Sequence, residues 1–190
     1  MTTAGLSDPF ETDGYVMLPK LLAGEIFRVV YEHALKKAST ITELLDKQVP
    51  GTPAFYGDAV MERVMVRLQP VVERVTKLSV YPTYAYGRFY KHGDVLEPHR
   101  DRPACELTMS LSLGSVPQTP WPLWIEGPRG GVRVDLQAGD AVLFRGVERM
   151  HWRERFEGQL AVQVFLHYVD QSGPYREWKF DKRPALSCPL

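Results

Sequence analysis

The sequence has few cysteines, no long apolar run and no excess of charge of either sign. Cys105 and Cys188 are too few for a disulfide framework, and neither has a Cys or His neighbour at zinc-finger spacing. We expect Cys105 to be a small buried residue of a strand and Cys188 to be an exposed thiol. Lys plus Arg and Asp plus Glu both total 23, so the formal net charge is zero. This balance gives no electrostatic reason to expect a nucleic-acid partner.

Membrane-spanning and export signals are lacking as well. No stretch of about 18 apolar residues is present, and the first residues show no signal-peptide pattern. We therefore expect a soluble, cytoplasmic protein without a membrane partner. The apolar content of 44% is ample for a core, and 190 residues favour one domain spanning the whole chain.

Four stretches of different pattern follow one another within this expected domain. Residues 1–12 lack periodicity and are expected to form a mobile arm. Residues 13–80 are mainly helical, 81–170 are rich in strand patterns, and 171–190 form a tail that is expected to pack back in part.

The helical stretch has two segments with apolar residues at helical spacing, 23–37 and 59–78. Pro70 is expected to kink the second helix or to begin a new one. A further helical turn is expected near residues 41–45. Residues 48–58 carry several glycines and prolines and should form a loop that either covers a site or packs onto the helices.

Short strand patterns dominate the second half of the chain and are separated by glycine and proline turns. They lie at residues 83–90, 105–113, 123–126, 131–136, 141–145 and 159–169. Strands that follow helices, instead of alternating with them, favour an antiparallel two-sheet sandwich or jelly roll with helices packed outside one sheet. The expected fold class is therefore α+β and mainly β.

A His-x-Asp pair, His99 and Asp101, lies between two strand patterns. In an extended segment these side chains point to the same face, so an imidazole and a carboxylate can occupy adjacent positions on one metal ion. The chain contains five histidines, so such a pair can also arise by chance. Pro98 favours an extended backbone before it, and Gly93 marks a turn, which supports a ligand-bearing strand.

A third ligand has to come from elsewhere, and His151 is preferred to His92 and His167. His151 follows a strand pattern, and the intervening chain is long enough to cross a barrel and return. His92 lies in a turn, whereas His167 could line a cavity from the last strand. Two histidines and one carboxylate form a facial set that suits Fe(II) and leaves positions open. Zinc with an open position could use the same residues for hydrolysis.

These motifs together resemble the prolyl-4-hydroxylase-like branch of the Fe(II)/2-oxoglutarate dioxygenases over residues 14–169. The residues that carry the resemblance are Tyr90, Gly93, Glu97, Pro98, His99 and Asp101, followed by Gly139, Asp140 and His151. The resemblance implies a double-stranded β-helix, or jelly roll, with Fe(II) held by His99, Asp101 and His151. It also implies 2-oxoglutarate as cosubstrate, O2, and hydroxylation of a small-molecule or amino-acid-like substrate with release of succinate and CO2. Because Asp101 occupies the position that a halide would need, we expect hydroxylation and not halogenation.

The residues expected to contact the cosubstrate depart from the family pattern. The family carries an Arg or Lys after the distal histidine, and residues 158–163 of this chain contain neither. A buried dianion needs charge-assisted hydrogen bonds. Arg88 is the first candidate and Arg153 the second, and Gln163 could add a neutral hydrogen bond. Tyr90, which shares the Arg88 face of its strand, is implied by the resemblance to lie beside the 2-oxo acid.

Three classes of function stay open at this point. The first is the Fe(II)/2-oxoglutarate oxygenase, and the second is a cupin-like metal-binding jelly roll with a non-oxidative activity. The third is a catalytically silent binding module. The resemblance, and not the ligand set, favours iron and an enzyme.

Overall fold

The computed structural model describes residues 9–40 and 48–188, and their strands form two antiparallel sheets. The six-stranded sheet has the order β1 (Tyr15–Leu18), β8 (Ala141–Arg145), β5 (Leu107–Val116), β10 (Leu160–Asp170), β3 (Val80–Lys91), β2 (Ala54–Tyr56). The four-stranded sheet has the order β4 (Leu96–His99), β9 (His151–Arg153), β6 (Leu123–Gly127), β7 (Gly130–Val134). The expectation of a mainly β jelly roll is confirmed.

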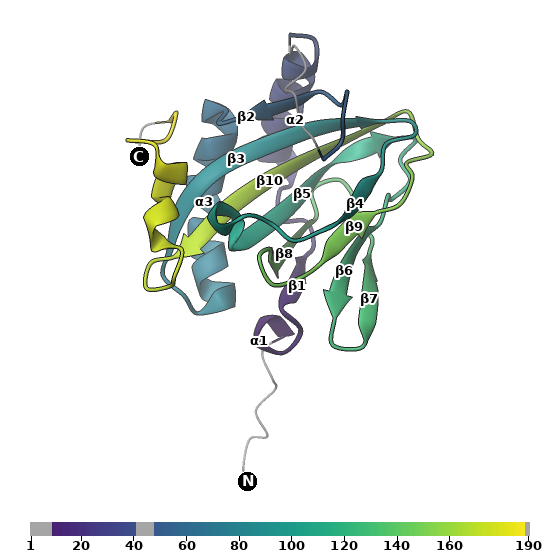
Figure 1. Cartoon of the computed structure of the whole chain (residues 1–190). Coiled ribbons are helices and arrows are strands. Elements are labelled where there is room, and N and C mark those ends of the chain that lie inside the picture. The colour runs from purple at the N-terminus through teal and green to yellow at the C-terminus, as the bar shows by residue number, and fades with distance from the viewer. Residues whose placement is uncertain (1–8, 41–47, 189–190) are drawn as a thin grey trace.

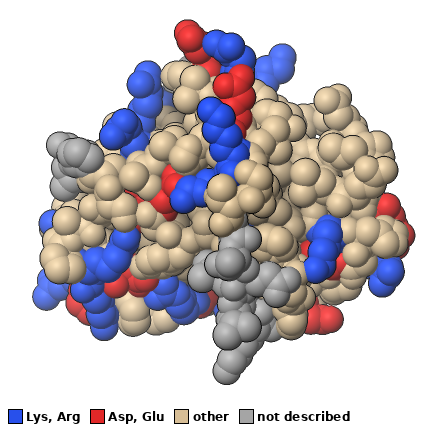
Figure 2. All heavy atoms as spheres, turned by 90° about the horizontal axis from the view of Figure 1, so that it is seen from above, with Lys and Arg blue, Asp and Glu red and all other residues tan. Residues whose placement is uncertain are grey.

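Helices cover one face of the larger sheet (Figure 1). They are α1 (Pro9–Asp13), α2 (Gly24–Ala38) and α3 (Ala59–Thr76), and two short 3-10 helices, η1 (Pro103–Cys105) and η2 (Arg176–Lys182), lie later in the chain. None of the helices within the described ranges is long and apolar enough to cross a membrane. On the face of the molecule seen in Figure 2, Lys and Arg side chains are scattered, with Asp and Glu side chains among them.

Alternation along the long strands gives the larger sheet two different faces. Apolar side chains such as Phe89, Val164 and Leu166 point from β3 and β10 toward Met61 and Met65 of α3 and form the main core. The opposite face carries polar side chains, because residues two apart share a face. That second face looks into the space between the two sheets, where the candidate site lies.

Helix α3 begins at a strong cap and runs through its proline. Asp58 accepts hydrogen bonds from the backbone N–H groups of Val60 and Met61, at 3.0 and 3.2 Å, and thus satisfies two free donors of the first turn. Pro70 lies inside this single helix, so it does not begin a new one. The helix ends where Lys77 takes a left-handed conformation with φ of 61°.

The structure corrects three expectations about the periphery of the fold. Residues 9–12 are not part of an arm, because they belong to α1 and Phe10 is fully buried. Cys188 is buried and not exposed, because the tail packs back against the core. Cys105 is buried as expected but lies in η1 and not in a strand. The helical turn expected at 41–45 and residues 1–8 of the arm lie outside the described residues.

The loop expected at residues 48–58 contains a short edge strand, β2, paired with β3. Phe55 packs into the main core beside Phe89, with a ring-centroid distance of 5.9 Å. Tyr56 and Gln48, by contrast, line a cavity between the sheets. This segment therefore both packs onto the fold and forms part of a cavity wall.

Candidate metal centre

Pairing of β4 with β9 brings two distant histidines together. His99 lies directly opposite His151 in the antiparallel register of these strands. Asp101 follows β4, and its backbone N–H donates to the carbonyl of Gly146 at 2.9 Å. The His99–Asp101 pair and the distant His151 thus meet at one end of the smaller sheet.

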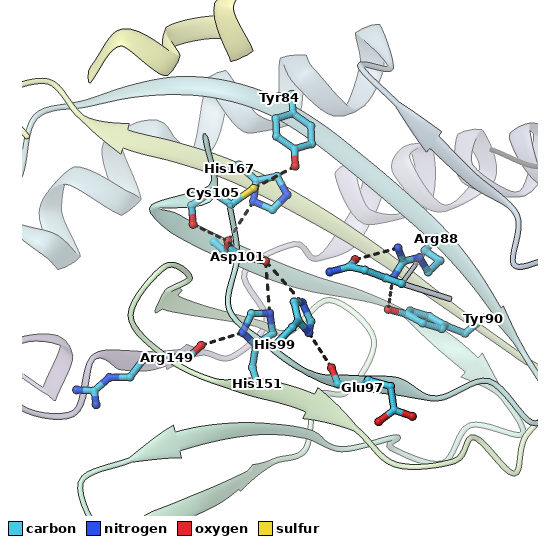
Figure 3. Close-up of polar contacts among 12 residues, drawn as sticks. Tyr84, Arg88, Tyr90, Glu97, His99, Asp101, Cys105, Arg149, His151 and His167 are labelled. Atoms are coloured by element: carbon cyan, nitrogen blue, oxygen red, sulfur yellow. Dashed lines mark hydrogen bonds and ion pairs between the residues drawn. The ribbon is translucent and has the colours of Figure 1, made fainter. Parts of the chain in front are cut away.

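The three side chains converge on a common point (Figure 3). Asp101 Oδ1 lies 3.7 Å from His99 Nε2 and 3.6 Å from His151 Nε2. One potential ligand atom from each residue lies within 4.8 Å of the other two. This spacing is what ligands around a single ion require, because metal–nitrogen and metal–oxygen bonds are about 2.0–2.2 Å long.

Both histidines are oriented by backbone carbonyls. His99 Nδ1 lies 2.8 Å from the carbonyl of Glu97, and His151 Nδ1 lies 3.0 Å from that of Arg149. A carbonyl can only accept, so each Nδ1 carries the proton and each Nε2 presents a lone pair to the common point. Burial lowers the pKa of His151 more than the nearby Asp101 raises it, which favours the neutral, ligand-competent ring.

Asp101 is held by a hydroxyl that leaves its other oxygen available. Thr108 donates to Asp101 Oδ2 at 2.7 Å, and Oδ1 is the oxygen that faces the histidines. Gly146 packs so closely that a Cβ there would lie 2.4 Å from Asp101 Oδ2. The carboxylate is therefore fixed from two sides.

His167 supports Thr108 and does not join the triad. Its Nδ1 lies 3.1 Å from the Thr108 hydroxyl, and burial lowers the pKa of the ring to about 4, so the ring is neutral. Because the Thr108 hydroxyl donates its proton to Asp101, the His167 Nδ1–H donates to the Thr108 oxygen. Asp101, Cys105 and His167 also offer three ligand atoms within 4.8 Å. Burial raises the pKa of the Cys105 thiol, however, and Tyr84 Oη lies 3.0 Å from its sulfur. A protonated thiol is a poor ligand, so the two-histidine set is favoured.

A cavity of about 540 Å³ adjoins the triad, and all three of its residues line the wall. Arg88 lines it as well, so the polar face of β3 points inward. Arg88 Nη1 donates to Tyr90 Oη at 3.1 Å, and its Nη2 donates to Gln48 Oε1 at 3.3 Å. Gln163, which pairs with Arg88 across β3 and β10, donates to Ser112 Oγ at 3.4 Å. Of these groups, Arg88 and Gln48 line the cavity, while Tyr90 and Gln163 are buried beside it.

Arg153 lies on β9 two residues after His151 and therefore on the same face. Its side chain is buried, Nη1 donates to the carbonyl of Trp121, and the guanidinium lies 4.9 Å from the centre of the Trp121 ring. The Tyr90 ring meets the same indole edge-on at 4.7 Å. Arg153, Trp121 and Tyr90 thus form one buried group behind the cavity.

Sequence reasoning missed Thr108 and Gly146. A signal for Thr108 existed, because Thr108, Ser110 and Ser112 alternate with apolar residues along β5 and are all buried. A buried polar stripe marks a strand whose inner face lines a site. Gly146 gave no comparable signal, since its role depends on close contact with Asp101 across the fold.

Comparison with solved structures supports this architecture, although no family model matches the sequence and no curated protein matches it at a significant level. A prolyl-4-hydroxylase from Pseudomonas putida aligns with a TM-score of 0.71 and 16% identity, covering 86% of this chain and 96% of that one. SnoN, an α-ketoglutarate-dependent epimerase from nogalamycin biosynthesis, aligns with a TM-score of 0.74 and 15% identity, covering 95% and 92%. HygX from Streptomyces hygroscopicus, with nickel, 2-oxoglutarate and hygromycin B bound, aligns with a TM-score of 0.69 and 14% identity, covering 90% and 88%.

Sequence identities of this size show a shared fold alone. The three proteins share the fold across nearly their whole lengths. This chain has two facing antiparallel sheets, helices outside the larger sheet, and the His-x-Asp pair at the end of a strand of the smaller sheet. The chain has a double-stranded β-helix fold, which it shares with these three proteins.

Proposed function

We propose that this protein is a non-haem Fe(II)- and 2-oxoglutarate-dependent oxygenase. It hydroxylates a small-molecule or amino-acid-like substrate and releases succinate and CO2. The observation that carries the proposal is the convergence of His99, Asp101 and His151 beside a cavity lined by a buried arginine.

The triad fits Fe(II) in donor type and in orientation. Two neutral imidazole nitrogens and one carboxylate oxygen are the ligands that non-haem iron uses in a facial set. The hydrogen bonds to the Glu97 and Arg149 carbonyls fix both rings with Nε2 toward the common point. A facial set leaves the opposite side of an ion open to the cavity.

Bound Fe(II), with 2-oxoglutarate and O2, supplies the oxidising power for replacing a substrate C–H bond by C–OH. The chain's own residues aim and protect that chemistry. Thr108 keeps Asp101 in a single orientation, and the Phe144 ring lies edge-on to His151 at 4.7 Å, which shields it from water. The phenols of Tyr84 and Tyr86 line the wall where a substrate would lie.

The neighbouring structures support a small-molecule substrate. HygX is described with hygromycin B bound, and SnoN acts in nogalamycin biosynthesis. SnoN is an epimerase, so this fold also accommodates reactions other than hydroxylation. Hydroxylation is the outcome that we propose here.

An anaerobic titration tests the proposal. Chelation of Fe(II) by a 2-oxo acid gives a weak visible charge-transfer band, which should form with 2-oxoglutarate in the wild type. His151→Ala should lose the band and weaken metal binding by about 10–100-fold or more. His92→Ala is the matched control, because His92 is exposed and lies outside the cavity wall.

Succinate formation from 2-oxoglutarate and O2 completes the test. Metal binding without a band for any 2-oxo acid would support the cupin-like alternative, and absence of metal binding would support a silent binding module. Full succinate production by His151→Ala would contradict the triad.

A further inference from the structure

Arg153 is a buried cation without a counter-ion among the residues that the structure describes. Only 1% of its surface is exposed. Nη1 donates to the Trp121 carbonyl, while Nε and Nη2 find no hydrogen-bond partner within residues 9–40 and 48–188. An unpaired buried charge is costly, and unsatisfied donors add to that cost. The arrangement is explained if an anion completes it.

We infer that Arg153 binds the far carboxylate of the 2-oxo diacid, an assignment that rests on the proposed function. The guanidinium stays charged at neutral pH, because an arginine side chain keeps its proton in proteins. Its planar fork can grip a carboxylate with the two donors that are unpaired. A neutral ligand would leave the charge uncompensated.

The position on the strand suits this role. Arg153 follows His151 by two residues on one face, a separation of about 6.6 Å along a strand. That distance is comparable with the length of a five-carbon diacid whose 2-oxo end lies at the triad. Leu96, which pairs with Arg153 across β4 and β9, lines the cavity, as does His151. The cavity wall therefore reaches the cross-strand partner of Arg153 and the residue two before it on β9, while Arg153 itself is buried behind that wall.

Arg88 has a different role in this arrangement. It already donates to Tyr90 Oη and Gln48 Oε1. Because the Tyr90 oxygen accepts from Arg88, the Tyr90 hydroxyl proton is directed to another acceptor. Tyr90 is completely buried, and its ring and the Arg153 guanidinium both contact the Trp121 ring. The far carboxylate would accept from Arg153 and Tyr90 together, and Arg88 would position Tyr90.

Two ligands distinguish binding of the far carboxylate by Arg153 from a purely structural role of this residue. With Mn(II) in place of Fe(II), binding of 2-oxoglutarate and of 2-oxopentanoate is measured by calorimetry. The second compound has the same carbon chain without the far carboxylate. The wild type should prefer 2-oxoglutarate strongly. Arg153→Met should reduce that preference by about 100-fold, as expected for truncating one partner of a buried charge pair.

Arg153→Lys should retain part of the preference, and Arg88→Met should change it less than tenfold. Stability of the ligand-free protein gives a second readout. Replacing an uncompensated buried charge by an apolar side chain of similar volume is neutral or stabilising, so Arg153→Met should keep or raise the melting temperature.

The outcomes are distinguishable. If the metal-loaded wild type binds neither 2-oxo acid, the proposed function fails. If the wild type prefers 2-oxoglutarate and Arg153→Met keeps that preference, only the Arg153 assignment fails. A destabilised Arg153→Met with an unchanged preference would show that Arg153 serves Trp121 packing alone. Loss of the preference in Arg88→Met alone would transfer the role to Arg88.

Discussion

At the scale of single residues, the candidate site depends on groups that are not themselves ligands. The Glu97 and Arg149 carbonyls select the histidine tautomers, and Thr108 selects the free oxygen of Asp101. Such partners fix ring and carboxylate orientation, and their loss weakens a metal site without removing a ligand.

Gly146 gives a sharp prediction at this scale. A Cβ there would lie 2.3 Å from the Cys105 carbonyl and 2.4 Å from Asp101 Oδ2, so Gly146→Ala should displace Asp101. We expect Mn(II) affinity to fall by about 10–100-fold and the free energy of unfolding by about 1–3 kcal/mol. Calorimetry and urea denaturation measure the two effects.

Gly173→Ala is a suitable control. A Cβ at Gly173 would lie 2.9 Å from that of Asp170, which is a tight contact outside the candidate site. This variant should lose stability but keep its metal affinity. Unchanged Mn(II) affinity in Gly146→Ala would contradict the role assigned to Gly146.

At the scale of elements, side chains alternate between the two faces of a strand, so that one face packs into the core and the other lines the candidate site. On β3, Ala85 and Phe89 pack against the helices, while Tyr84 and Arg88 face the cavity. The sequence predicted this alternation, because it is a property of an extended chain. It predicted the helices equally well, since their apolar residues recur at helical spacing.

The junction of α2 with α3 can be tested through Asp58. Its carboxylate caps α3, and it lies 2.9 Å from His33 Nε2 and 3.1 Å from Lys37 Nζ of α2. Asp58→Ala should lower the free energy of unfolding by about 1–2 kcal/mol, mainly through the lost cap. Asp58→Asn should cost less, because an amide oxygen can still accept from the helix.

The pH dependence of that cost follows from the pKa of Asp58. Burial would raise this pKa, but hydrogen bonds from His33 and Lys37 outweigh burial and lower it. A lowered carboxyl pKa contributes stability above the unfolded pKa, and this contribution is lost as the pH falls through the folded value. The difference between wild type and Asp58→Asn should therefore shrink in acid. A constant difference from pH 7 to pH 3 would contradict this account.

At the scale of the whole molecule, a bound metal would connect parts of the two sheets. His99 and His151 belong to the smaller sheet, and Asp101 is bonded to Thr108 of the larger one. Ligands that bind only the folded state stabilise it by mass action. Metal and cosubstrate should therefore raise the melting temperature together.

We expect Mn(II) and 2-oxoglutarate, each at about 100 times its dissociation constant, to add about 2.7 kcal/mol or more. For a chain of this size, that corresponds to a shift of about 5–10 °C in a thermal melt. EDTA should reverse the shift, His92→Ala should retain it, and His151→Ala should lose most of it. An equal shift in His151→Ala would show that the metal binds elsewhere.

The sequence alone determined the longer strands, the two principal helices and the His-x-Asp pair, because each depends on residues that are close along the chain. The short strands β2 and β9 were not predicted. It also predicted the jelly-roll fold through the resemblance of its motifs. Only the tertiary structure placed His151 opposite His99 and set Gly146 against Asp101.

The burial of Phe10 and Cys188 was decided by the tertiary structure too, as was the isolation of the Arg153 charge. Local periodicity shows which face of an element is apolar. It does not show which faces meet, or which buried charge lacks a partner, because both depend on contacts between residues far apart in the chain.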